Sequence, residues 1–263
     1  MAGCGASPAS TKFEVGSGTT IQAYAGICGG EDIQPHSDPY FHGISFDEIS
    51  NYITTGGGNA CGVSTATGNT LPVINALPNN NLSIPISTPF TLAGTATDAN
   101  NDPLTYCWEG WDLQGTQTWN AGATAAAGNT VPLFKSRIPK TNGIRTFPDI
   151  AVILAGYPAN PAAAMGGLKG ETLSPVARAM NFRLTVRDNR AGGGGVVSSG
   201  GLGCQTSTPF VAVPPVILKL ALDMSKKTLP NASTLTLAVV VVTFGIVSAS
   251  EPSFIVLAVI TVG

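Results

Sequence analysis

Met180-Asn181-Phe182-Arg183-Leu184-Thr185-Val186-Arg187-Asp188 is the stretch that decides the fold of this chain. Apolar and polar residues alternate through it, and a period of two places successive side chains on opposite faces of a β-strand. Residues 88–96 and 104–108 are also predicted strands, separated by the turn-forming segment 98–103. The sequence therefore predicts a mainly β protein.

The overall composition agrees with this prediction. Of the 263 residues, 32 are glycine and 19 are proline, and only 11% are charged, against about 25% in an average globular protein. The apolar content of 43% argues against wholesale disorder. The net charge is −2 and the basic residues are scattered, so we expect no nucleic-acid partner.

One helix is well marked before the β-rich part. Ser45 followed by Glu48 forms a capping box, and Ile44 with Ile49 forms a hydrophobic staple across it. The glycines at 56–58 should end this helix. The sequence therefore predicts a helix that begins after Ser45 as N-cap.

Changes in periodicity divide the chain into four parts. A breaker-rich linker at 71–82 separates residues 1–70 from a β-rich part at 83–215. Within the latter, 113–170 is predicted to be irregular, with one short helix near 150–154. Residues 216–263 form an apolar, β-prone tail that could donate strands, anchor the chain in a membrane or be misread sequence.

Five cysteines lie far apart, without a C-x-x-C pair, which favours disulfides over a zinc knuckle. Cys107 and Cys204 border strands of one predicted module, so we expect them to form a bridge. Cys28 and Cys61 flank the predicted helix and form the second candidate pair, which leaves Cys4 over. The alternative is a set of buried free thiols in a reducing compartment.

Four oxygen-bearing side chains predict a candidate calcium site. Asp98, Asn100 and Asp102 alternate in one turn, and Asp188 ends a strand that could lie nearby. The competing interpretation is a turn stabilised by Asx hydrogen bonds. The residues alone favour that interpretation, because they do not fill a complete calcium-binding loop.

Two segments near the N-terminus carry a resemblance to a known family. Residues 20–29 and 37–49 resemble the C-terminal part of bacterial reprolysin-like zinc metallopeptidases, which are metzincins. In that family the residues matching Ile21, Gln22, Ala23 and Tyr24 would form the Met-turn beneath the zinc, and 37–49 would lead into the closing helix of the catalytic domain.

Two later segments extend the resemblance, which covers about residues 14–200. Residues 102–109 and 181–195 resemble the Ig-like or cadherin-like module that follows the peptidase in such proteins. The resemblance implies that 1–70 is a small α-containing remnant of a metzincin catalytic domain and that 83–215 is an Ig-like β-sandwich.

Two departures from the family pattern bear on activity. The zinc-binding motif H-E-x-x-H is absent, and the only histidines are His36 and His42. Gln22 stands where the Met-turn would carry methionine. We therefore expect no catalytic residue and no zinc in this chain, zinc belonging only to a presumed full-length parent.

These observations predict an extracellular, non-catalytic portion of a secreted metallopeptidase, which couples the peptidase domain to an attachment module. Its expected partners are the missing upstream catalytic segment and protein or cell-surface ligands. The alternative is an extracellular structural or adhesive β protein that self-associates through its apolar tail. The only expected cofactor of the chain itself is calcium.

Overall fold

The computed structural model of the chain describes residues 9–75, 77, 82–113, 119, 131–155, 169–199 and 202–207. They belong to the first of two units of the chain, Met1–Ala212, whereas the second unit, Val213–Gly263, lies outside them. The predicted apolar tail therefore also lies outside the described residues. In the described ranges, no helix combines the length and the apolar character needed to cross a membrane.

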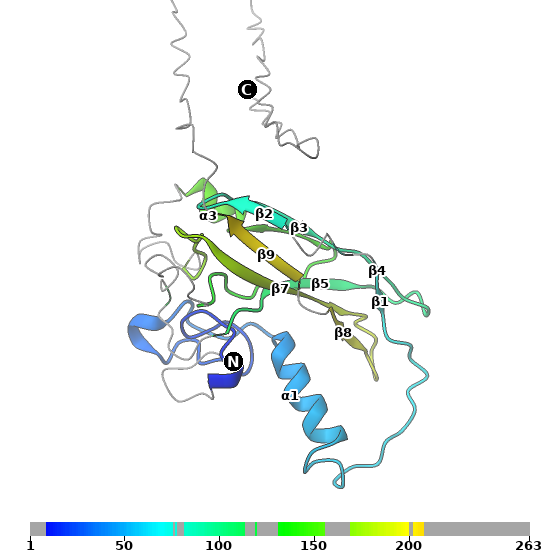
Figure 1. Cartoon of the computed structure of the whole chain (residues 1–263). Coiled ribbons are helices and arrows are strands. Elements are labelled where there is room, and N and C mark those ends of the chain that lie inside the picture. The colour runs from blue at the N-terminus through cyan, green and yellow to red at the C-terminus, as the bar shows by residue number, and fades with distance from the viewer. Residues whose placement is uncertain are drawn as a thin grey trace, which may run out of the picture. The chain divides into compact units, whose positions relative to one another are not determined.

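This part of the chain is mainly β, as the sequence predicted (Figure 1). Its strands are β1 (Val73–Ile74), β2 (Leu82–Pro85), β3 (Phe90–Ala93), β4 (Ala96–Thr97), β5 (Thr105–Gly110), β6 (Ile144–Phe147), β7 (Arg178–Arg187), β8 (Val196–Ser198) and β9 (Leu202–Ser207). The helices are α1 (Gly43–Thr54), α3 (Ile150–Leu154) and two short 3-10 turns at Ala9–Thr11 and Gly29–Glu31.

The largest sheet is built around β7, which contains most of the alternating stretch. Its strand order is β2-β9-β7-β5, with β8 also paired to β7. The partners of β7 are all antiparallel to it, whereas β2 runs parallel to β9. Two smaller antiparallel pairs are formed by β3 with β6 and by β1 with β4.

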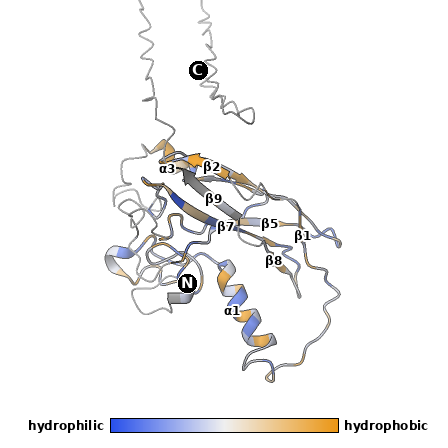
Figure 2. Ribbon diagram, in the orientation of Figure 1, coloured by the Kyte–Doolittle hydropathy of each residue, from blue (hydrophilic) through white to orange (hydrophobic). Residues whose placement is uncertain are grey.

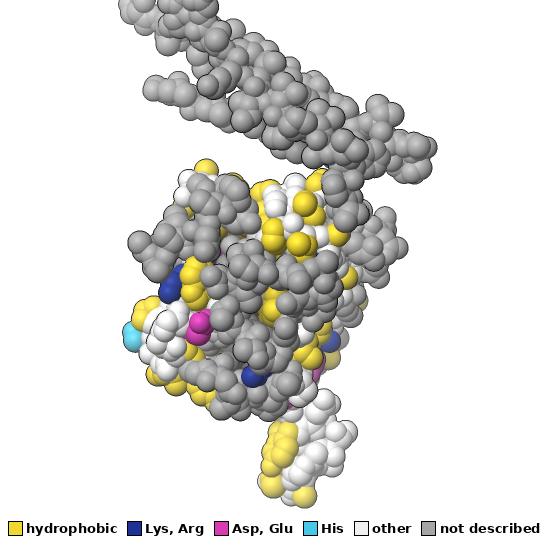
Figure 3. Space-filling model, turned by 60° about the vertical axis from the view of Figure 1, so that its left-hand side comes forward, with side chains coloured by type: hydrophobic (Ala, Val, Ile, Leu, Met, Phe, Trp, Pro, Cys, Tyr) yellow, Lys and Arg dark blue, Asp and Glu magenta, His cyan; other side chains and the backbone are white. Residues whose placement is uncertain are grey.

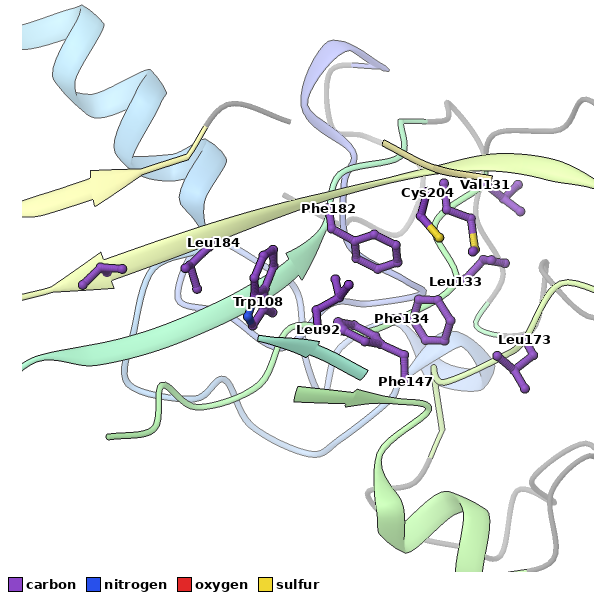
Figure 4. Packing of buried hydrophobic residues seen from close by; sticks show 12 residues of the cluster. Leu92, Trp108, Val131, Leu133, Phe134, Phe147, Leu173, Phe182, Leu184 and Cys204 are labelled. Carbon is purple, nitrogen blue, oxygen red and sulfur yellow. The ribbon is translucent and has the colours of Figure 1, made fainter. Parts of the chain in front are cut away.

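One face of β7 forms the apolar core (Figure 4). Met180, Phe182, Leu184 and Val186 alternate along the strand and are all buried on this face. The β3 and β6 pair covers them with Leu92 and Phe147, and further apolar residues join from β5, β9 and the connecting segments. The ring centroids of Phe147 and Phe182 lie 4.8 Å apart, a separation typical of packed aromatic pairs.

The opposite face of β7 is covered by the N-terminal segment and α1. Arg187 donates a hydrogen bond to the Phe41 carbonyl at 2.7 Å, and Arg183 forms an ion pair with Asp47 on α1. The Arg183 guanidinium carbon also lies 3.8 Å from the centroid of the Trp111 ring. On this face Thr185 is buried, Arg183 and Arg187 are half-buried, and Ala179 and Asn181 stay exposed, so this cover is less complete than the apolar one and differs from it in chemistry.

The start of α1 differs from the sequence prediction. The N-cap is His42, whose Nδ1 accepts a hydrogen bond from the Ile44 amide at 3.2 Å, and Ser45 lies inside the helix. The predicted capping box is wrong, because the helix begins at Gly43 and the Ser45 amide already donates to the His42 carbonyl at 2.9 Å. The helix ends at Thr54, before the glycines, as predicted.

Two β predictions also need correction. The single strand predicted at 88–96 is divided into β3 and β4, because the chain leaves the partner β6 at Gly94 and then pairs with β1. The region 113–170 was predicted to be irregular, but its described part contains β6. The short helix predicted near 150–154 is confirmed as α3.

Candidate functional site

Three of the four predicted calcium ligands meet at one end of the main sheet. One carboxylate oxygen from each of Asp98, Asp102 and Asp188 lies within 4.8 Å of the others. The pairing of Thr105 with Arg187 explains this proximity, because it brings the start of β5 next to the end of β7. Residues separated by more than 80 positions in the sequence thereby form one acidic cluster.

The turn before β5 leaves carboxylate oxygens free for a ligand. Asp98 Oδ1 accepts hydrogen bonds from the amides of Asn100 at 2.8 Å and Asp102 at 3.1 Å, as the Asx-turn interpretation expects. Oδ2 of Asp98 and Oδ2 of Asp102 are nevertheless buried without a hydrogen-bond partner. The turn geometry and a bound cation are therefore compatible.

Asp188 is held in place by backbone amides. Its Oδ1 accepts from the amides of Arg190 at 3.1 Å and Gly195 at 2.8 Å, and its Oδ2 accepts from the Asn69 side chain. A Cβ on Gly195 would lie 2.9 Å from Asp188 Oδ2, so glycine permits this close approach. Burial opposes ionisation, but the hydrogen bond from Asn69 and the backbone hydrogen bonds leave the pKa of Asp188 below its usual value.

Two features limit the affinity of this cluster for a cation. The fourth predicted ligand, Asn100, already uses its Oδ1 to accept a hydrogen bond from the Thr70 amide at 2.8 Å. Arg190 Nη1 lies 3.6 Å from Asp102 Oδ2, so its guanidinium competes with a bound cation for the Asp102 carboxylate. The oxygen-only donor set fits the preference of calcium, and its incompleteness fits weak binding.

A second group of buried polar side chains lies between the N-terminal segment and the sheet, and we call it the polar interface cluster: Tyr40, His42, Glu109, Ser136 and Thr185. Glu109 is at its centre. Oε1 accepts from the Ser136 hydroxyl at 2.8 Å, and Oε2 accepts from the Thr185 hydroxyl at 3.1 Å and from the Gly43 amide. Tyr40 in turn donates to Ser136 at 2.8 Å.

His42 is neutral in this cluster. Burial lowers its pKa to about 3, and the nearby cations Arg187 and Arg183 act in the same direction, while Glu14 opposes them. Since Nδ1 accepts the Ile44 amide, the proton is on Nε2, which lies 3.6 Å from Glu109 Oε1. Burial also raises the pKa of Glu109, against the effects of Arg187 and its hydrogen-bond donors.

The polar interface cluster is not arranged for nucleophilic catalysis. The Ser136 hydroxyl donates to Glu109 at 2.8 Å, and Glu109 also accepts from Thr185 and the Gly43 amide, so its oxygens are engaged in holding the segments together. His42, Glu109 and Ser136 are also almost completely buried. The cluster therefore joins two segments of the chain through directional hydrogen bonds.

The predicted Met-turn-like segment forms a tight turn supported by Glu14. Glu14 Oε1 accepts the amides of Thr19 at 2.9 Å and Thr20 at 3.2 Å. Ile21 and Tyr24 are exposed, with 45% and 39% of their surface accessible. Sequence reasoning missed Glu14 and Glu109, because no local pattern indicates that a single glutamate will be buried.

Neither histidine contributes to a cluster of potential metal ligands in the described residues, where Asp98, Asp102 and Asp188 form the one group found. His36 is exposed, and His42 is engaged at the start of α1.

Both predicted disulfides are wrong. Cys61, Cys107 and Cys204 are free thiols, and Cys61 is exposed. Cys107 pairs with Thr185 of β7 on the polar face, whereas Cys204 pairs with Met180 on the core face, so the sheet itself separates the two sulfurs. Burial raises the pKa of the Cys107 thiol to about 12, which makes it unreactive while the protein is folded.

Comparison of the chain with protein-family models, curated proteins and solved structures finds no match to any of them.

Proposed function

We propose that this chain is the non-catalytic portion of a secreted reprolysin-like zinc metallopeptidase. In this proposal residues 1–70 close the peptidase domain, and the β-rich part is an extracellular attachment module for protein or cell-surface ligands. The resemblance of residues 20–29 and 37–49 to that family supports the assignment. Zinc would belong to an upstream catalytic segment, which is the principal partner.

The observation that carries this proposal is an exposed apolar surface on the segments that resemble the metzincin. Ile21 and Ile27 are 45% and 71% exposed in and after the Met-turn-like segment, and Tyr52 and Ile53 are 61% and 55% exposed on α1. The ribbon at the end of α1 has the colour of hydrophobic residues in Figure 2, and Figure 3 shows hydrophobic side chains on the lobe that projects at the bottom of the view. A catalytic segment packed on these side chains would remove their apolar area from water.

The polar interface cluster supports the coupling role. It ties the start of α1 to β5 and β7 through buried hydrogen bonds to Glu109. A buried network of this kind fixes orientation more strongly than a flexible linker does. The attachment module would therefore be held in a defined orientation against the peptidase domain.

Strand order supports the Ig-like assignment of the β-rich part. In this proposal the neighbours β5, β7 and β9 would be strands C, F and G of an Ig-like sandwich, and the pair β3 and β6 would be strands B and E. Trp108 is buried on β5, the counterpart of strand C, where Ig domains also bury a tryptophan.

The test is to compare this chain with a longer chain that includes the preceding part of its gene. We expect the longer chain to contain H-E-x-x-H, to bind one zinc by elemental analysis and to cleave peptides, while this chain does neither. Hydrogen exchange should also slow at Tyr24 and Ile53 in the longer chain. The proposal fails if no zinc motif precedes these residues, or if this chain binds zinc that is lost in the variant His36→Ala or His42→Ala.

A further inference from the structure

A pocket of about 300 Å³ lies between β5, the segment 137–142, β6 and the start of α3. It is distinct from the acidic cluster and from the exposed apolar surface of the N-terminal segments. Its volume is at the lower end of the range of ligand sites and corresponds to roughly ten water molecules. The pocket therefore suits a small ligand or one terminal residue of a larger ligand.

Positive charge dominates the lining of this pocket. Arg137, Lys140 and Arg145 contribute three cations, and Asp149 is the single acidic residue among the lining residues. Glu171 lies behind the two arginines and accepts hydrogen bonds from Arg137 Nε at 2.8 Å and Arg145 Nη2 at 3.0 Å. Even with Glu171 included, the site keeps one excess positive charge, carried by the exposed Lys140.

Two guanidinium groups at the pocket still have unused hydrogen-bond donors. Arg137 is fixed by Glu171 and Asp149, yet its Nη2 is buried without a hydrogen-bond partner. The side chain of Arg145 is 9% exposed, and its Nε also has no hydrogen-bond partner. Buried donors without partners are costly, so a small side-chain adjustment toward a bound anion would be favourable.

The rim of the same pocket is apolar. Ile138, Ile144 and Ile150 come from three different segments, all line the pocket, and each is 57% exposed. Three exposed isoleucines around a cationic lining would contact the apolar part of a ligand whose charged end lies between the arginines and Lys140.

We propose that this pocket binds the carboxylate end of a small apolar ligand, in particular the C-terminal residue of a peptide that ends in an aliphatic side chain. The cations receive the carboxylate, and the isoleucines cover the side chain. Asn142 and Thr146, which also line the pocket, supply hydrogen-bonding groups for the preceding amide. This inference does not depend on the proposed function.

The test uses N-acetyl-L-leucine as the probe and its neutral amide as the matched ligand, with binding followed by NMR chemical shifts of the whole chain. For a ligand of this size we expect a Kd of about 1 mM. The amide should bind at least about tenfold more weakly, since it lacks the charge that the cations recognise. Hexanoate serves as a further ligand: weaker binding than N-acetyl-L-leucine supports the peptide terminus, and equal or tighter binding overturns that assignment.

Surface variants keep the test separate from folding. Lys140→Gln and Ile144→Ser should each weaken binding of the acid several-fold, whereas Lys140→Arg should retain it. Ile53→Ser is the matched control, because Ile53 is 55% exposed but lies on α1. Equal binding of acid and amide, equal loss in the Ile53 control, or no shift at concentrations about tenfold above 1 mM would overturn the proposal.

Discussion

One face of β7 is buried along the strand and the other only around Thr185, with Arg183 and Arg187 half-buried, and different forces hold the two faces. On one face Phe182 and Leu184 pack into an apolar core, where contacts are non-directional and scale with buried area. On the other face Thr185 and Arg187 meet Glu109 and the N-terminal segment through hydrogen bonds and charges. One strand can therefore provide bulk stability on one side and a specific, pH-sensitive connection on the other.

The largest effect should come from the apolar face. Phe182→Ala removes a fully buried ring that packs on Phe147 and Phe134, so we expect a loss of about 4 kcal/mol in the free energy of unfolding. Urea unfolding followed by tryptophan fluorescence measures it. Phe182→Leu should cost clearly less, and equal costs for both variants would show that the ring contacts matter little.

On the polar face the central change is Glu109→Ala. It leaves the Gly43 amide and the hydroxyls of Ser136 and Thr185 without their acceptor. We therefore expect a loss of about 3 kcal/mol in the free energy of unfolding. Hydrogen exchange at the start of α1 should accelerate more than exchange in β7. Uniform acceleration across both elements would instead mean that the polar face does not act as a separate connection.

The dependence on pH should distinguish the two faces further. The pKa of His42 is about 3 in the folded state, below the usual 6.5, so the unfolded chain binds the proton more tightly. Its contribution to stability is therefore present above about pH 6.5 and is lost as the pH falls toward 3. Between pH 7 and pH 5 the stability contributed by His42 should fall by roughly 2 kcal/mol.

The control for this prediction is His42→Asn, since asparagine can also serve as an N-cap. The stability contributed by Glu109 changes with pH in the opposite direction. Its raised pKa favours the folded state at low pH, and that contribution is lost as the pH rises through the pKa of Glu109 in the folded state. Subtracting the stability curve of the variant from that of the original chain isolates the histidine. A difference curve that is flat from pH 7 to pH 5 would contradict the prediction.

The smallest effect is expected at the end of β7, where the acidic cluster lies. If calcium binds there weakly, a concentration tenfold above its Kd adds about 1.4 kcal/mol, or roughly 3 to 5 °C in the melting temperature. Asp102→Asn should remove this response while keeping the turn, whose amide contacts use Asp98. Equal melting temperatures with calcium and with a chelator would exclude the site.

Local pattern predicted the elements whose signals are local. The alternation around Phe182 indicated β7, the glycines after Thr54 indicated the end of α1, and α3 was found from a short apolar run. β6 was missed because its four residues lie in a stretch rich in glycine and proline. Its position depends on pairing with β3, which is distant in the sequence.

The candidate sites were predictable only in part. Alternating oxygen donors in the turn pointed to Asp98 and Asp102, and the pairing of β5 with β7 brings Asp188 to them. The isoleucine-rimmed pocket left no sequence signal, because Arg137, Lys140 and Arg145 are ordinary scattered cations in the sequence. The disulfide prediction was wrong because flanking strands indicate proximity but not which face a cysteine occupies.

The sequence by itself determined that the protein is mainly β, where its strongest strand lies and where α1 ends, because these depend on the periodicity and breakers of neighbouring residues. The tertiary structure alone decided that His42 caps α1, that Glu109 is buried as its partner and that Cys107 and Cys204 lie on opposite faces. The physical reason is that buried polar groups must find hydrogen-bond partners wherever the fold supplies them, and the acceptor of the Gly43 amide lies 66 positions away in the sequence.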